Sequence, residues 1–244
     1  MEYCRIFYNG ISFDDAIPGY LTLNVIGRGL KPNIIETIDL PGTDGSHFVS
    51  QKVGETKITV EYLLTADNSS EFNWRFSILN NYLKQTDGLV KFSFADEGGF
   101  YREGVLSEVE NPPYNQFRGV GKFTLLCPDP YKYLDIRDFK SDRIPGNLDI
   151  PVVPNKMVFS VNNPGENLKI TNETTNKFIE LNKKVSTGDV ITFDKNNIKD
   201  KNNTNLMKYL NILSDFEDFT IKAGDKISLY PKGELLINAR RKAR

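Results

Sequence analysis

The chain has 244 residues, of which 39% are hydrophobic and 26% are charged, and its formal net charge is -1. This composition excludes an intrinsically disordered chain and a protein embedded in lipid, and the charge balance excludes general electrostatic binding of nucleic acid or of an anionic membrane. The length fits two domains of about 100 to 150 residues each. We therefore expect two folded domains, with no specific nucleic-acid binding and no membrane insertion.

The first elements of the chain are extended. Residues 3–8 and 11–13 flank Asn9-Gly10, a dipeptide typical of a two-residue hairpin turn. Residues 20–26 form an apolar and polar pattern typical of a strand, which ends at Gly27-Arg28-Gly29. No helix pattern follows these glycines, so they predict a turn and not a phosphate-binding loop.

Residues 34–64 predict a β-arm that projects from the first domain. The return limb alternates strictly, with one face made of Ile58, Val60, Tyr62 and Leu64. The tip, residues 40–54, mixes Gly and Pro with charged and polar residues and is too polar for a core. Because a two-stranded arm is marginally stable alone and exposes unpaired edges, we expect another chain to cover it.

A helix is predicted over residues 70–86, after a Ser that would cap it. Its apolar stripe consists of Phe72, Phe76, Leu79 and Leu83. Trp74 would widen that stripe, so we expect it in the core. Three more strands follow as a meander, at residues 89–94, 101–110 and 119–127.

The second domain is predicted to be a β-sandwich. Residues 135–155 are polar and contain three prolines, which indicates a linker between an N-terminal domain (residues 1–134) and a C-terminal domain (residues 156–244). Short alternating runs separated by Gly, Pro or Asn fill the C-terminal part. The predicted fold class is mainly β: a β-rich α+β N-terminal domain with one helix and a protruding hairpin arm, followed by the sandwich.

The order of these elements resembles the distal tail proteins of phages with long non-contractile tails, over nearly the whole chain. The segments that carry the resemblance are Asn9-Gly10, residues 25–29, Asp44-Gly45, residues 58–60, residues 79–89, residues 101–105, residues 129–131, residues 188–194, Phe219, residues 223–227 and the final strand. Each segment is a degenerate β pattern, so the resemblance depends on their combination.

The resemblance implies a hexameric ring at the tail tip of a virion, made in the host bacterial cytoplasm. In such a ring the long hairpin encircles the neighbouring subunit, and the C-terminal domain is galectin-like. The implied partners are the tail tube protein, the tail-tip protein and, in some members, a receptor-binding protein, and DNA passes through the lumen. Together with the arm pattern, this predicts an oligomer interface at Arg28, Ile35, Thr37, Leu40, Asp44, His47, Phe48, Val53 and Lys57.

A second hypothesis is a monomeric carbohydrate-binding module that recognises host cell-wall polysaccharide. Tyr209 and Tyr230 in the sandwich are the candidate residues for stacking on a sugar. The basic end of the chain has two interpretations: a frayed, solvated tail, or a clasp for an acidic neighbour in an assembly. Its residues are Arg240, Arg241, Lys242 and Arg244.

An enzyme is the weakest hypothesis, and we expect no catalytic residue, metal or cofactor. His47 lies near Ser46, Asp44 and Asp39, but a triad needs groups that converge from separate rigid elements. The acid pairs Asp96-Glu97 and Glu108 with Glu110 are expected on the solvated surface. Cys4 and Cys127 form no C-x-x-C motif and are expected to be reduced thiols.

Overall fold

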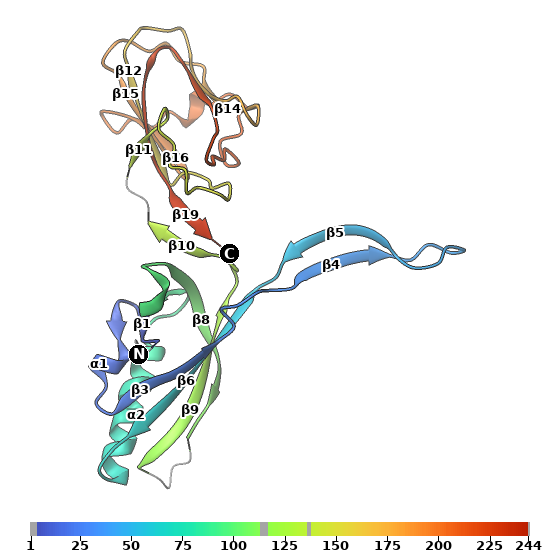
Figure 1. The fold of residues 1–244 in the computed structure, drawn as a ribbon. Coiled ribbons are helices and arrows are strands. Elements are labelled where there is room, and N and C mark those ends of the chain that lie inside the picture. Colours follow the sequence, from blue (N-terminus) through green and yellow to red (C-terminus); the bar gives the residue numbers. More distant parts are fainter. Residues whose placement is uncertain (1–3, 113–116, 136–137, 244) are drawn as a thin grey trace. The chain divides into compact units, whose positions relative to one another are not determined.

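The computed structural model describes residues 4–112, 117–135 and 138–243. The chain divides between Lys132 and Tyr133 into two compact units (Figure 1). Strands dominate both units, which confirms the predicted mainly β fold. No helix within the described ranges is both long and apolar enough to cross a membrane.

The first unit contains a sheet whose main path runs β2-β1-β7-β8-β9-β6-β3, with antiparallel neighbours. Its strands are β1 (Ile6–Tyr8), β2 (Ile11–Ser12), β3 (Tyr20–Ile26), β6 (Thr56–Thr65), β7 (Val90–Phe94), β8 (Tyr101–Glu110) and β9 (Arg118–Cys127). Its helical elements are α1 (Phe13–Ala16), α2 (Ser69–Leu83) and the 3-10 turn η1 (Ala95–Glu97). The sequence predicted one helix, because α1 is a single turn and too short to show a helical period.

The predicted first hairpin is present between β1 and β2. Its two turn residues, Asn9 and Gly10, have φ angles of 49° and 80°. Positive φ at both central positions is characteristic of a type I′ turn, whose twist matches that of the flanking strands. The turn sets the register in which Tyr8 lies opposite Ile11.

The core of the first unit lies between the sheet and α2. The alternating residues of β6 are fully buried and share one cluster with the apolar stripe of α2. β6 is an interior strand, paired with β3 on one side and β9 on the other. The prediction that residues 56–64 belong to the arm was therefore wrong: their alternation is real, but it marks a strand of the main sheet, and the arm is shorter.

Helix α2 begins one residue earlier than predicted and ends at Leu83. Its cap is Asn68, whose side-chain oxygen accepts a hydrogen bond of 2.9 Å from the backbone N–H of Glu71, so the predicted Ser cap was wrong. Trp74 is 58% exposed and does not join the core. Two residues correspond to about 200° of helical rotation, so Trp74 points away from the face that Phe72 and Phe76 bury.

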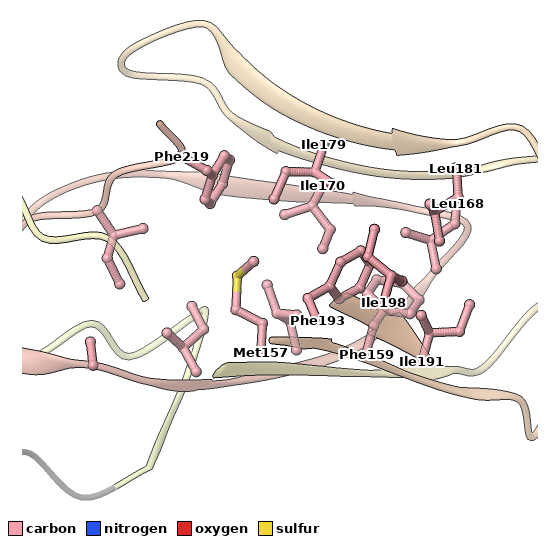
Figure 2. Packing of buried hydrophobic residues seen from close by; sticks show 14 of the residues in the cluster. Met157, Phe159, Leu168, Ile170, Ile179, Leu181, Ile191, Phe193, Ile198 and Phe219 are labelled. Carbon is pink, nitrogen blue, oxygen red and sulfur yellow. The ribbon is translucent and has the colours of Figure 1, made fainter. Parts of the chain in front are cut away.

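The second unit is a β-sandwich, as predicted. One sheet has the order β11-β18-β12-β15-β16 and the other the order β14-β13-β17. The strands are β11 (Phe139–Lys140), β12 (Lys156–Val161), β13 (Leu168–Asn172), β14 (Lys177–Leu181), β15 (Val190–Asp194), β16 (Asn197–Asp200), β17 (Ile227–Tyr230) and β18 (Gly233–Asn238). Figure 2 shows Ile170 and Ile179 of one sheet facing Phe193 and Phe159 of the other across the buried core.

The segment predicted as a linker is folded into this sandwich. Leu148 is fully buried, and Phe139 lies in β11, beside β18. Val152 exchanges two backbone hydrogen bonds of 2.9 Å with Ile221. Prolines and polar residues dominate the segment, but its few apolar side chains anchor it, so the second unit begins about twenty residues before its predicted start.

The basic end of the chain is a strand and not a frayed tail. β19 (Arg240–Ala243) pairs with β10 (Lys132–Asp135). Arg240 lies 3.7 Å from Asp135, and Arg241 lies 3.9 Å from Asp149. Arg244, the last residue of the predicted basic end, lies outside the described residues.

Candidate functional site

The candidate site is the hairpin arm of the first unit, formed by β4 (Asn33–Ile38) and β5 (His47–Val53). These strands form a two-stranded sheet of their own, which Figure 1 shows continuing beyond β3 and β6 as a long hairpin. Every residue of β4 is exposed, and so is every residue of β5 except the half-buried Val53. The described chain therefore leaves both faces of the arm open to a partner.

The cross-strand register gives the arm two chemically different faces, because paired residues share a face. We call the first the uncharged face; it consists of Asn33, Ile35, Thr37, Phe48, Gln51 and Val53. We call the second the charged face; it consists of Ile34, Glu36, Ile38, His47, Ser50 and Lys52. A β-bulge at Val49 separates the pairs formed by Glu36 and Thr37. The uncharged face carries no ionisable side chain.

The uncharged face exposes two large apolar side chains. Ile35 is 60% exposed and Phe48 is 63% exposed. Each face has one internal hydrogen bond: Ser50 donates to the Glu36 carboxylate at 2.9 Å on the charged face, and the Asn33 amide donates to Gln51 at 3.3 Å on the uncharged face. The uncharged face is the better docking surface, because covering it removes apolar area from water without desolvating a charge.

The tip of the arm is a preformed turn. The Thr43 N–H and hydroxyl both donate to the Leu40 carbonyl oxygen, at 3.3 and 2.9 Å. Pro41 and Gly42 occupy the central positions, and Gly42 has a φ of 84°, the arrangement of a type II turn. Asp39 and Asp44 flank this turn and are exposed.

Two ion pairs hold the base of the arm, one partly exposed and one buried. The Arg28 guanidinium lies 2.7 Å from the Asp96 carboxylate and 4.8 Å from the centre of the Phe94 ring. The hydrogen bond from Arg28 lowers the pKa of Asp96. Arg102, which is buried, makes a bidentate pair with Glu97. Asp96 is exposed, as we expected, whereas the Glu97 side chain is only 10% exposed in its pair with Arg102, so the expectation of a solvated surface position was wrong for Glu97.

Beside this base lies a pocket of about 420 Å³. It is lined by Arg28, Gly29, Leu30, Lys31, Asn33, Val53, Pro130 and Tyr131. The Lys31 ammonium donates a 2.5 Å hydrogen bond to the Pro130 carbonyl oxygen. Burial lowers the pKa of Lys31, and the nearby cations Arg102 and Lys132 lower it further. A cation in these surroundings favours an anionic partner.

The structure distributes the predicted interface residues over four places. Ile35, Thr37, Phe48 and Val53 share the uncharged face, and His47 lies on the charged face. Leu40 and Asp44 are at the tip. Arg28 is at the base, engaged with Asp96, and Lys57 lies in β6, 2.6 Å from Glu108.

Sequence reasoning missed Val49 and Lys31. Val49 is 54% exposed and is the extra residue of the bulge, which no alternation pattern reveals. Lys31 follows the turn glycines as an ordinary lysine, and its surroundings arise from residues about a hundred positions away. The bulge at Val49 and the surroundings of Lys31 both arise from strand pairing or contacts between separate parts of the chain, which the local sequence does not reveal.

The other residues considered from the sequence are His47, Cys4, Cys127, Tyr209 and Tyr230. His47 is exposed at the start of β5, and no cluster of three metal-binding side chains occurs within the described ranges. Cys4 and Cys127 are free thiols, and burial raises the pKa of each to about 11. Tyr230 lies on β17 and the backbone of Tyr209 hydrogen bonds beside β14, at opposite edges of one sheet, so they do not form a shared sugar platform.

Comparison with known proteins identifies both units. Residues 19–126 match the family model "Phage tail protein RIFT-related domain", and residues 150–236 match "Siphovirus-type tail component, C-terminal domain". No curated protein matches the chain at a significant level.

Two solved structures resemble the whole chain. The crystal structure of the Dit protein (gp 19.1) of phage SPP1, a hub of the adsorption apparatus of phages that infect Gram-positive hosts, has a TM-score of 0.79 at 16% identity and covers 100% of both chains. A chain of the phage P2 baseplate in its activated conformation has a TM-score of 0.50 at 13% identity and covers 100% of this chain and 99% of that one. At these identities, the likeness shows a shared fold.

Proposed function

This chain belongs to the phage distal tail protein family, and we propose that it acts as a ring-forming adaptor at the tip of a phage or phage-derived tail. It is a virion tail component with no chemical step of its own. The proposed ring contains six copies, joins the tail tube to the tail-tip protein and lets DNA pass. The net charge of -1 suits a ring whose lumen does not bind the phosphates of the passing DNA tightly.

The observation that carries this proposal is the open, uncharged face of the arm. A hairpin with exposed Ile35 and Phe48 and no third strand among the described residues gains little stability by itself. Covering one such side chain contributes about 1.5 to 3 kcal/mol. A second copy of the chain can supply that cover.

The arm and the surface that receives it are different parts of the molecule. An interface between unlike surfaces of identical chains is heterologous, and it closes into a ring when the rotation between neighbours closes. The arm would also present its strand edges to the neighbour, which satisfies backbone groups left unpaired in the isolated chain. The C-terminal sandwich would then be available for a receptor-binding protein.

The test is the oligomeric state with and without the arm. Asn33 and Val53 are cross-strand partners, so replacing residues 34–52 by Asn-Gly closes a short hairpin at the arm base. We expect wild-type protein to elute as an oligomer with six-fold images in negative stain, and the shortened variant to be a folded monomer by light scattering. A wild-type monomer at high concentration, or an unchanged oligomer without the arm, would overturn the proposal.

A further inference from the structure

The tip of the arm concentrates negative charge. Residues 39–46 include Asp39 and Asp44 and no Lys or Arg. Neither carboxylate pairs with a cation in the part of the chain that the structure describes. The turn between Leu40 and Thr43 fixes the backbone that carries them, so little ordering is needed when they bind.

The pocket at the arm base has the opposite character. Lys31 contacts a carbonyl oxygen, and no carboxylate within the described ranges forms an ion pair with it. The amide of Asn33 and the backbone of Gly29 also line the pocket. The arginines nearby already have their own carboxylates, so Lys31 is the cation left for an incoming acid.

The length of the arm is close to the spacing that neighbouring subunits would have in the proposed ring. β4 and the residues that lead to Gly42 at the tip are ten residues long and span at most about 33 Å, the length they would have at the rise of a β-strand. A compact body of roughly 110 residues, the first unit without its arm, has a diameter of roughly 34 Å. In a head-to-tail ring, neighbours are related by about one such diameter, which brings the tip of one arm to the arm base of the next copy.

We infer that the acidic tip, through Asp39 and Asp44, docks in the pocket beside Lys31 of the next copy. This inference rests on the proposed ring and identifies one contact that holds it. The uncharged face of the arm buries apolar area against the next copy. The contact between the tip and the pocket fixes the position of the arm along that copy. Such charge complementarity fixes register more than it adds affinity.

Charge reversal in the full-length chain tests the contact. One variant carries Asp39→Lys with Asp44→Lys, a second carries Lys31→Glu, and a third combines all three changes. The matched control, Asp87→Lys with Asp142→Lys, makes the same change in charge at two other exposed acids. The protein concentration at half-assembly is measured by analytical ultracentrifugation, and circular dichroism checks folding.

We expect each reversal alone to raise the half-assembly concentration about 10-fold or more, and the combined variant to return to within about 3-fold of wild type. Lys31→Gln tests the charge if Lys31→Glu unfolds; it should weaken assembly without being rescued by the tip reversal. The inference would be overturned if neither reversal changed the half-assembly concentration from the wild-type value. It would also be overturned if the combined variant assembled no better than the single reversal that assembles more weakly. Either outcome would leave the proposed ring intact. A monomeric wild type would instead refute the ring itself.

Discussion

Gly27 lies against the backbone of Lys57 at the point where β3 ends and the arm begins. A β-carbon at Gly27 would lie 2.1 Å from the Lys57 carbonyl oxygen, and the φ of Gly27 is 98°. Both the space and the backbone angle therefore require glycine. The path of the chain from the sheet into the arm depends on this close approach of two strands.

Gly27→Ala should lower the free energy of unfolding of the first unit by about 2 to 3 kcal/mol, because a side chain there meets backbone and adopts a strained φ. Gly29→Ala is the matched control, since a β-carbon at Gly29 meets nothing within 4 Å. Urea unfolding followed by the fluorescence of Trp74, the single tryptophan, reports on this unit. Equal losses for the two variants would contradict this explanation.

The two faces of the arm should respond differently to one added charge. Ile35→Asp alters the uncharged face and Ile38→Asp the charged face, at residues that are 60% and 52% exposed on the same strand. We expect Ile35→Asp to raise the half-assembly concentration about 10- to 100-fold, because it places a carboxylate in the buried interface, and Ile38→Asp to change it less than about 3-fold. Sedimentation of both variants shows which face docks. A larger increase in the half-assembly concentration for Ile38→Asp than for Ile35→Asp would assign the interface to the charged face.

Local patterns predicted the elements whose signals are local. The Asn9-Gly10 turn and the alternation of Ile58 to Leu64 both correspond to observed structure, because turn chemistry and burial on one face act over a few residues. The extent of the arm was not predictable in this way. A strand in a projecting arm and a strand in the main sheet show the same alternation of apolar and polar residues. Only the pairing of β6 with β3 and β9 shows that it belongs to the main sheet.

The site was predictable in outline and not in detail. Ile35 and Phe48 could be named as exposed arm residues, but their common face follows from a register that a bulge shifts. The engagement of Arg28 by Asp96 joins residues 68 positions apart. The burial of Leu148 within a proline-containing segment was missed for the same reason: tertiary contacts decide it.

Glu97→Ala should cost about 3 to 5 kcal/mol of the free energy of unfolding, because it leaves the buried Arg102 guanidinium without its carboxylate. Asp15→Ala is the control: it removes the partner of Arg5 from a pair whose side chains are 48% and 62% exposed, and we expect a loss below about 1 kcal/mol. Urea unfolding of both variants measures the difference. Similar small losses would show that the Arg102 pair contributes no more than a surface pair.

Cys4 should react slowly with iodoacetamide in the folded protein. Burial raises the pKa of its thiol from an ordinary 9.0 to about 11, so the thiolate fraction at pH 8 falls about 100-fold. Alkylation at Cys4, followed by peptide mass spectrometry, should accelerate about 10-fold per pH unit up to pH 10, while the unfolded chain levels off near pH 9. Since the folded pKa is the higher one, this thiol's contribution to stability is present below pH 9 and is lost as pH rises toward 11. A folded-state rate at pH 8 equal to that of the unfolded chain would contradict the raised pKa.

Asn68 and the serines that follow it distinguish the observed helix cap from the predicted one. Asn68→Ala removes the acceptor of the Glu71 N–H bond and should lower the free energy of unfolding by about 1 kcal/mol. Ser69→Ala, one residue inside α2, should leave stability unchanged or raise it by a few tenths of a kcal/mol, because alanine is the better helix former. Thermal unfolding of the two variants under the same conditions measures both effects. If Ser69→Ala lowered the free energy of unfolding more than Asn68→Ala, the cap would be Ser69, as the sequence pattern predicted.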